Sequence, residues 1–281
     1  MTRFDEIYDR PDPRSYFGVL GALEYRTPHH AQGVFRGLLG PAGLSGGRGP
    51  AGGPRATVLD VCCSYGINAA LLNHAVTLED LRERYTSPQV ARLTTAELIE
   101  SDRAYYAARR RPDAVPVVGL DISAPAIAYG RAVGLLDEGF VENLETAAPS
   151  PELYRATRGT RLITLTGGAS FLSARTFRPL LEGMAQPSWV AAFVLRTGSY
   201  RPIADGLVPL GLVTEKDTSR TYPQRRFTDP AERDFAIAAV AAAGDDPRGK
   251  ETDGRFHAAL HLTRPAAEAA ARPLRTLLPG G

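Results

Sequence analysis

Two aspartates interrupt apolar stretches of the chain at positions where a carboxylate can bind a ligand. Asp60 is the one charged residue of the run Thr57 to Val61, whose side chains are typical of a strand buried on both faces of a parallel sheet. Asp121 stands near the end of a second such run, Pro116 to Ile122. An acid at the end of the second strand can accept hydrogen bonds from both ribose hydroxyls of an adenosine. The two acids therefore indicate a nucleoside site where these strands end.

The residues between the first strand and its helix form a tight turn. Cys62, Cys63, Ser64 and Gly66 are small or turn-prone, and Ile67 to Leu72 follows with a helical pattern. This order of strand, turn and helix puts Gly66 where a ligand or the helix start approaches the backbone. The G-x-G-x-x-G spacing of dinucleotide-binding turns is absent, because Gly66 is the only glycine of the turn.

The stretch VLDVCCSYG resembles the first motif of the class I S-adenosylmethionine-dependent methyltransferases, in which a hydrophobic strand and an acid precede a glycine-rich loop. Asp60 matches that acid, and Cys62, Ser64 and Gly66 match the three glycine positions. Asp121 matches the acid of the second motif, and its alternative role is only to cap the next helix. The resemblance implies S-adenosylmethionine as cofactor. The residues that it assigns to cofactor binding are Asp60, Cys62, Ser64, Tyr65, Gly66, Asp121, Ile122, Glu142, Asn143 and Thr166.

The assignments after the second motif depend on weaker patterns. Glu142 and Asn143 end a short predicted strand, at the position that faces the adenine in the family, but a polar strand end also fits an ordinary exposed loop. Thr166 and Ser170 follow the fourth predicted strand beside two glycines, where ligands bind in open α/β sheets. No obvious general base and no acid that could act with a metal stands there. His257 and His261 share a face of the last strand, and we expect them to be structural, because no third metal ligand is near.

The apolar runs and the resemblance together predict the fold class. We expect an α/β, Rossmann-like, doubly wound and mostly parallel seven-stranded sheet with an antiparallel last strand. The strands are predicted at 57–61, 116–122, 139–144, 161–165, 188–195, 212–218 and 256–262. Asp121 comes 55 residues after Gly66, whereas a βαβ unit takes about 30 in total, so an insert is expected at 75–114 with helices at 78–85 and 95–111.

The chain ahead of the first motif is predicted to be a separate unit. Residues 1–56 are interpreted as a helical lid followed by a Gly/Pro linker, and residues 57–281 as the methyltransferase-like domain. Helices are expected at 12–23 and 28–39, with Asp12 and Thr27 as N-caps. Tyr16 and Tyr25 are candidate catalytic residues together with Thr166 and Ser170, because aromatic faces can stabilise a sulfonium. The alternative is that these rings only join the helices to the sheet.

Composition excludes several classes of protein. A formal net charge of +2 from 33 basic and 31 acidic residues favours a small-molecule substrate over nucleic acid or a membrane surface. The only two cysteines, Cys62 and Cys63, are adjacent, so they are expected to be reduced, and no secretory signal or membrane span is evident. These features predict a cytoplasmic protein without a metal. Its oligomeric state stays open, with a homodimer as one alternative.

Three functions follow from these observations. The first is methyl transfer from S-adenosylmethionine to a small molecule, as in specialised metabolism. The second follows from Ser64 and Tyr65 at glycine-rich positions, which could turn the methionine arm so that another sulfonium carbon is attacked. That reaction releases methylthioadenosine, either by aminocarboxypropyl transfer or by closure to azetidine-2-carboxylate. The third is a non-catalytic domain that binds the cofactor or a partner.

Overall fold

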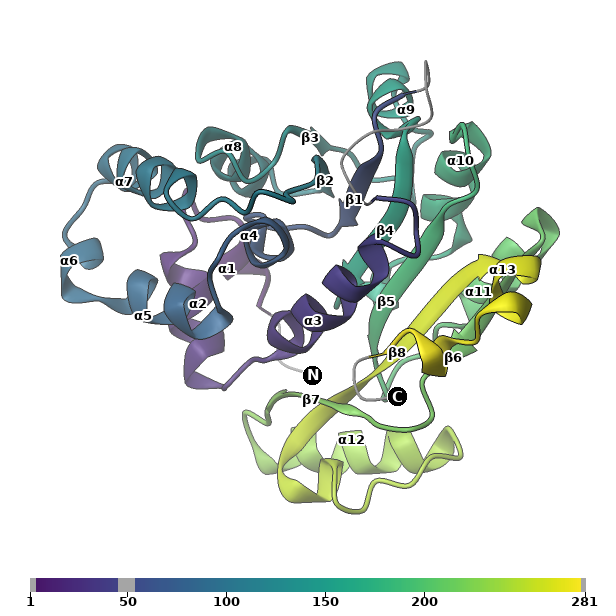
Figure 1. Cartoon of the computed structure of the whole chain (residues 1–281). Helices are drawn as coiled ribbons and strands as arrows, with labels where there is room; N and C mark the ends of the chain where they lie inside the picture. Colours follow the sequence, from purple (N-terminus) through teal and green to yellow (C-terminus); the bar gives the residue numbers. More distant parts are fainter. Residues whose placement is uncertain (1–3, 45–53, 279–281) are drawn as a thin grey trace.

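The computed structural model describes residues 4–44 and 54–278. Their central feature is an eight-stranded sheet with the order β3-β2-β1-β4-β5-β8-β6, in which β7 also pairs with β8 (Figure 1). The pairs among β1 to β5 are parallel, and β8 is antiparallel to β5, β6 and β7. The predicted Rossmann-like sheet with an antiparallel last strand is therefore confirmed, with one strand more than expected.

The elements follow one another in an alternating α/β order. The strands are β1 (Thr57–Val61), β2 (Val117–Asp121), β3 (Glu138–Val141), β4 (Thr160–Thr166), β5 (Trp189–Leu195), β6 (Leu212–Lys216), β7 (Tyr222–Arg226) and β8 (Arg255–Pro265). The helices are α1 (Asp5–Tyr8), α2 (Arg14–Ala22), α3 (Thr27–Leu39), α4 (Ile67–Asn73), α5 (Leu78–Thr86), α6 (Pro88–Ala91), α7 (Thr95–Ala107), α8 (Ala124–Ala132), α9 (Pro151–Thr157), α10 (Ala174–Gly183), α11 (Arg201–Leu207), α12 (Pro230–Ala242) and α13 (Ala266–Ala271). Short 3₁₀ helices include η1 (Ala169–Phe171) and η3 (Glu251–Asp253).

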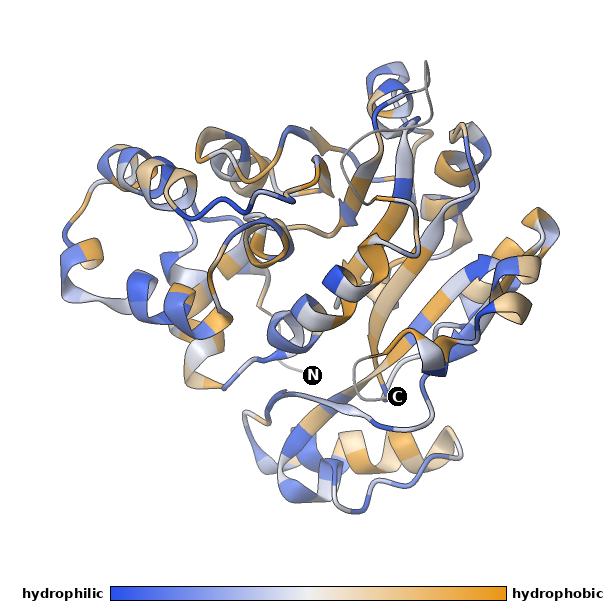
Figure 2. Ribbon diagram, viewed as in Figure 1, coloured by the Kyte–Doolittle hydropathy of each residue, from blue (hydrophilic) through white to orange (hydrophobic). Residues whose placement is uncertain are grey.

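The sheet is covered on both faces, as its apolar central strands require. Along β5, Ala191 and Phe193 belong to one buried apolar cluster, which includes residues of α2, α3, α4 and α8. Val190, Ala192 and Val194 alternate onto the other face, where α9, α10 and α11 complete a second cluster. Figure 2 shows the result, with apolar central strands and hydrophilic outer helix faces. The doubly wound arrangement follows from this alternation along strands that are buried throughout.

The two long helices of the insert between β1 and β2 begin at their predicted first residues, Leu78 and Thr95. Thr77 forms a capping box with Asp80 at the start of α5, and Thr94 forms one with Glu97 at the start of α7. A four-residue helix, α6, lies between them. Helix α5 packs against α2, so the insert lies with α1 and α2 at one side of the molecule, while α3 lies across the sheet (Figure 1).

The two longer N-terminal helices begin close to their predicted starts, α2 two residues later and α3 one residue earlier. Helix α2 starts at Arg14 after Pro13, and α3 starts at Thr27 itself after Arg26, in both cases without a side-chain cap. Asp12 and Thr27 are therefore not N-caps. The Gly/Pro linker falls largely on residues 45–53, outside the described residues.

The strand that was not predicted is β7, which lies at an edge of the sheet. It pairs with the first half of β8, while β6 pairs with the second half, so the long β8 holds two partners along one edge. Between β7 and β8 lie α12 and η3, which close the end of the sheet near the carboxyl end of β5 (Figure 1).

Candidate cofactor site at the carboxyl ends of the strands

The turn between β1 and α4 lies where the carboxyl ends of the parallel strands meet. Three of its residues are in the left-handed region, with φ of 55° at Cys62, 49° at Ser64 and 80° at Gly66. A left-handed residue with a Cβ costs about 1–2 kcal/mol, which explains why glycine is usual there. Cys62 and Ser64 therefore keep a glycine-type backbone path at positions that match two of the motif's glycines.

Asp121 holds this turn to the end of β2. Its Oδ2 accepts a hydrogen bond from the Ser64 backbone N–H at 2.8 Å, and its Oδ1 accepts one from the Ser123 N–H at 2.9 Å. Each carboxylate oxygen keeps further acceptor capacity, because an ionised carboxyl has about four lone-pair sites. Ser123 caps α8 with its hydroxyl, so helix capping does not require the Asp121 side chain.

Asp60 lies buried beneath the turn in a polar network. Its Oδ1 accepts hydrogen bonds from Asn68 Nδ2 at 2.9 Å and from Thr164 Oγ1 at 2.7 Å, and Asn68 Nδ2 also donates to Thr166 Oγ1 at 2.9 Å. Burial raises the pKa of Asp60 to about 7, although the bonds from Asn68 and Thr164 oppose that change. Asn68 is a site residue that the sequence did not reveal.

Two polar atoms at this site have no partner within the protein. Asp60 Oδ2 and Ser64 Oγ are buried and form no hydrogen bond with any residue in the described part of the chain. A buried polar atom without a partner costs about 1–3 kcal/mol, so such atoms are rare in folded proteins. Their position beside the left-handed turn marks a place where a ligand would supply the missing contacts.

Three exposed apolar side chains follow the ends of neighbouring strands. Ile122 after β2 is 71% exposed, Val141 at the end of β3 is 47% exposed, and Phe171 after β4 is 73% exposed. Large apolar side chains at such exposure are normally scattered singly. Ile122 directly follows Asp121 and Val141 is its register partner, so these two supply apolar surface next to Asp121.

Three tyrosines of the N-terminal segment gather above the turn. The ring of Tyr16 contacts those of Tyr8 and Tyr25 edge to face, with centroids 5.8 Å and 6.4 Å away. Burial, together with nearby Asp121, raises the pKa of Tyr8, and burial, with nearby Asp60, raises that of Tyr16. Burial also raises the pKa of Tyr25 to about 12. These phenols stay protonated at neutral pH, so they can offer ring faces and hydrogen-bond donors but not a general base.

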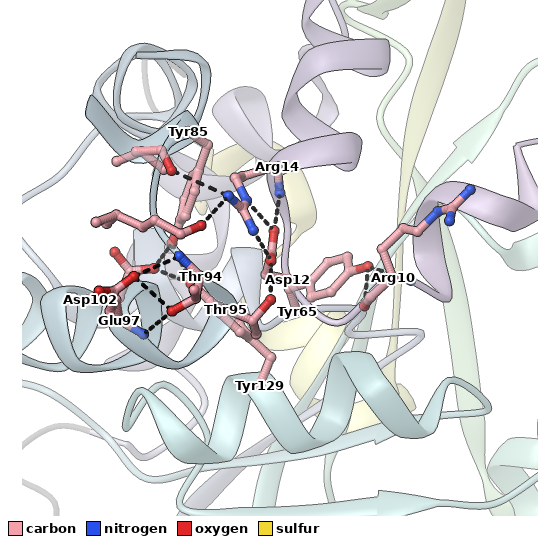
Figure 3. Close-up of polar contacts among 12 residues, drawn as sticks. Arg10, Asp12, Arg14, Tyr65, Tyr85, Thr94, Thr95, Glu97, Asp102 and Tyr129 are labelled. Atoms are coloured by element: carbon pink, nitrogen blue, oxygen red, sulfur yellow. Dashed lines mark hydrogen bonds and ion pairs between the residues drawn. The ribbon is translucent and has the colours of Figure 1, made fainter. Parts of the chain in front are cut away.

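Tyr65 ties the N-terminal segment to the turn. Its hydroxyl lies 2.9 Å from the carbonyl oxygens of both Ile7 and Arg10 and accepts a bond from the Arg10 N–H at 3.2 Å (Figure 3). Ser123 Oγ donates to the Tyr8 carbonyl at 2.6 Å. The segment that carries Tyr8 is therefore fastened to the loops after both β1 and β2. The Tyr65 hydroxyl points to this segment rather than to the orphaned atoms of the turn.

The same segment is fastened to the helical insert. Asp12 pairs with Arg14 at 2.7 Å and accepts a hydrogen bond from Thr95 Oγ1 at 2.8 Å (Figure 3). Arg14 also donates to the carbonyl oxygens of Val90 and Leu93. The insert and the N-terminal segment thus form a continuous cover beside the tyrosines.

The remaining predicted residues lie farther from the turn or are engaged elsewhere. Glu142 accepts two hydrogen bonds from Ser150, at 2.6 Å from its hydroxyl and 3.0 Å from its N–H, at the start of α9. Asn143 Oδ1 accepts a bond from the Glu145 N–H at 3.1 Å. Ser170 is exposed in η1. Only Thr166 of the candidates after β4 joins the Asp60 network.

The cysteines and histidines show no sign of metal chemistry in the described ranges. Burial raises the pKa of Cys62 to about 12 and also raises that of Cys63, so both thiols are unreactive. His257 contacts Thr221 Oγ1 at 3.0 Å, and His261 stacks on Tyr200. Across residues 4–44 and 54–278, no group of three or more His, Cys, Asp or Glu side chains is placed to hold a metal ion.

Comparison with known proteins adds a fold-level likeness. No family model and no curated protein matches the sequence. Among solved structures, the plantazolicin methyltransferase BpumL with S-adenosylhomocysteine (SAH) shares 10% identity over 92% of this chain and 93% of its own, at a TM-score of 0.40. The N-methyltransferase NodS from Bradyrhizobium japonicum WM9 with SAH shares 8% over 93% and 91%, at 0.39. Geranyl diphosphate C-methyltransferase from Streptomyces coelicolor A3(2) shares 10% over 83% and 75%, at 0.40.

The likeness is too distant to carry an argument about activity. The strand order is that of a Rossmann-like, doubly wound sheet with an antiparallel edge. Function has to be inferred from the geometry of the site, since one such fold hosts many reactions. No helix in the described part of the chain is both long and apolar enough to cross a bilayer.

Proposed function

We propose that the chain transfers the methyl group of S-adenosylmethionine to a small molecule. The observation that carries this proposal is the turn after β1, where Cys62, Ser64 and Gly66 are all left-handed and Asp121 binds the Ser64 N–H. Such a turn brings backbone close to a ligand and aims the acid of the next strand at the same place. SAH in the solved methyltransferases named above agrees with this choice of cofactor.

The residues present fit such a cofactor. Asp60 Oδ2 and Ser64 Oγ, the orphaned atoms, would meet its methionine part, and Asp121 would accept from the ribose hydroxyls. The exposed side chain of Ile122 supplies an apolar surface for the adenine. A cationic ligand beside Asp60 would favour the ionised carboxylate, which burial alone disfavours.

The bound cofactor supplies a methyl carbon that its sulfonium already activates. In such a transfer the acceptor atom would bond to that carbon, the sulfur would keep the electron pair of the broken sulfur–methyl bond, and the acceptor proton would leave to water. The protein mainly has to align the acceptor and exclude solvent. Tyr16 and Tyr25 suit this role, because they are protonated aromatic groups above the turn, and we propose residues 4–44 as the cover that carries them.

Attack on another sulfonium carbon is the alternative reaction, and the product distinguishes the two. Of the two residues that suggested it, Tyr65 has its hydroxyl bound to Ile7 and Arg10, while Ser64 keeps a glycine-type backbone. Incubation with S-adenosylmethionine and candidate acceptors, followed by mass spectrometry, should yield SAH. Methylthioadenosine would instead support the alternative, and an intact cofactor with all acceptors would support a binding domain.

The ribose contact can be tested apart from the structural role of Asp121. We expect Asp121→Ala to weaken SAH binding by about 1.5–3 kcal/mol, because it removes a charged hydrogen-bond partner. Calorimetry with SAH and with its 2′,3′-dideoxy analogue separates the two roles, since only SAH loses a ribose contact. Asp205→Ala, an exposed acid on α11, is the matched control. Equal losses for both ligands would show that Asp121 only holds the turn.

A further inference from the structure

A groove beside the tyrosines has the size of a small-molecule site. It has a volume of about 490 Å³ and lies between α2, the start of α3 and α5. Tyr16, Phe17 and Tyr25 line it together with Leu20 and other residues. Ligand pockets typically enclose about 300–1,000 Å³ and are lined by apolar and aromatic side chains with a few polar groups. The ring of Tyr16 contacts those of Phe17 and Tyr25 edge to face, so the three rings form one aromatic wall against which a flat apolar body can lie.

The groove adjoins the candidate cofactor site through two of its own rings. The Tyr25 hydroxyl lies 3.9 Å from the position that a Cβ on Gly167 would take, directly after β4. Tyr16 is near enough to Asp60 for that acid to contribute to the raised pKa of Tyr16, after burial. A molecule in the groove therefore lies against the same tyrosines that cover the turn.

Most of the charged side chains at the rim of the groove form ion pairs. Glu24 pairs with Arg226 at 2.5 Å and Arg255 at 2.6 Å, both from the β7 and β8 side, and Glu79 pairs with Arg82 at 2.5 Å.

Arg26 is an exposed cation at the rim that takes part in none of these pairs. The hydrogen bond from Arg255 lowers the pKa of Glu24, and the nearby charge of Arg26 lowers it further by a smaller amount. Within the described ranges the Arg26 guanidinium forms no ion pair, while its backbone N–H is fixed to the Gln224 carbonyl at 2.7 Å. The exposed His29 lines the groove one turn of α3 away. The groove therefore presents, beside an aromatic wall, an exposed cation that forms no ion pair with any described residue, although Glu24 lies near it.

We propose that this groove binds the methyl acceptor and that the acceptor is an aromatic acid. Its ring lies against the wall that Tyr16, Phe17 and Tyr25 form, and its carboxylate pairs with Arg26 at the rim. This assignment rests on the proposed methyl transfer and adds the substrate class to it. Arginine suits the role, since its planar donors match a carboxylate in a bidentate fashion.

The test compares an aromatic acid with its uncharged amide. Binding of 1-naphthoate and of 1-naphthamide is measured by calorimetry in the full-length protein, with SAH present. Wild type should bind the acid about three- to tenfold more tightly than the amide, and Arg26→Ala should remove that preference without weakening amide binding. Arg158→Ala, an exposed arginine at the far end of β4, should retain the preference. Tyr25→Leu should weaken binding of both probes, because it removes a ring of the wall.

The outcomes separate this inference from the proposed function. SAH affinity is measured in the same proteins and should be unchanged in Arg26→Ala. If wild type binds SAH but shows no preference for the acid, or if the preference survives in Arg26→Ala, the acceptor assignment is wrong while cofactor binding stands. If wild type does not bind SAH, the proposed function fails, and the acceptor assignment fails with it.

Discussion

Ser64 gives the sharpest test of how the turn after β1 is built. Its φ is 49°, and its hydroxyl is buried without a partner in the described protein. Replacing it with alanine removes the unsatisfied hydroxyl and keeps the strained backbone. Replacing it with glycine removes both. The difference between Ser64→Ala and Ser64→Gly therefore reports the cost of a left-handed Cβ, less the larger unfolded-state entropy of glycine.

The two contributions can be estimated separately. Loss of an unsatisfied buried hydroxyl should stabilise Ser64→Ala by about 1–3 kcal/mol. Relief of the left-handed Cβ is worth about 1–2 kcal/mol, and the larger entropy of glycine in the unfolded chain offsets about 0.5–1 kcal/mol. At the middle of both ranges, Ser64→Gly should thus be more stable than Ser64→Ala by about 0.75 kcal/mol. For a chain of this size, each kcal/mol raises Tm by roughly 2–4 °C.

Urea unfolding, followed by the fluorescence of Trp189, measures these differences in the absence of cofactor, since Trp189 is the only tryptophan and is buried. Calorimetry with S-adenosylmethionine gives the second readout. Both variants should lose about 0.5–1.5 kcal/mol of binding if the hydroxyl meets the cofactor. A Ser64→Gly protein no more stable than Ser64→Ala would refute the strain argument, and unchanged cofactor binding would remove Ser64 from the site.

Three further predictions concern other parts of the cover and the network. Because burial raises the folded-state pKa of Asp60 from 3.8 to about 7, its ionisation should remove up to about 4 kcal/mol of folding stability as pH rises from about 4 to 7. Asp60→Asn should lack this loss, and parallel stability profiles of the two proteins from pH 4 to 8 would contradict it. Tyr65→Phe should speed hydrogen exchange around Ile7 while lowering global stability by only about 1 kcal/mol, and unchanged exchange there would show that the hydroxyl does not fasten the segment. Asp102→Ala should cost about 3–5 kcal/mol, because it leaves Arg84 without its buried partner, and a thermal shift equivalent to less than 1 kcal/mol would disprove that role.

The sequence predicts the elements whose signals are local. Thr77 and Thr94 each precede an acid by three residues, and both capping boxes form, because every atom involved lies within one turn of helix. Strand β7, by contrast, lacks apolar alternation and contains Pro223, which favours an edge. Its pairing depends on the long β8, which extends past β6 and offers β7 the backbone groups that β6 does not reach.

The same distinction applies to the site. Asp60 and Asp121 can be found because a charge inside or at the end of an apolar strand is conspicuous. Asn68 cannot, since an asparagine in a helix is unremarkable until Thr166, 98 residues later in the chain, lies beside it. Likewise, the polar residues around Glu142 in the sequence do not reveal its hydrogen-bond partner. Both the N–H and the hydroxyl of Ser150, eight residues later, donate to its carboxylate.

The missing glycines of the turn have a counterpart on the neighbouring strand. Gly167 and Gly168, directly after β4, have φ of 79° and 73°, and a Cβ on Gly168 would lie 2.8 Å from Cys62 Sγ. The Cys62 side chain thus occupies space that the glycine at 168 leaves open. A turn with side chains can follow the glycine path only if the adjacent turn lacks one. The pair of turns, rather than the first motif alone, preserves the close approach of backbone that a cofactor site requires.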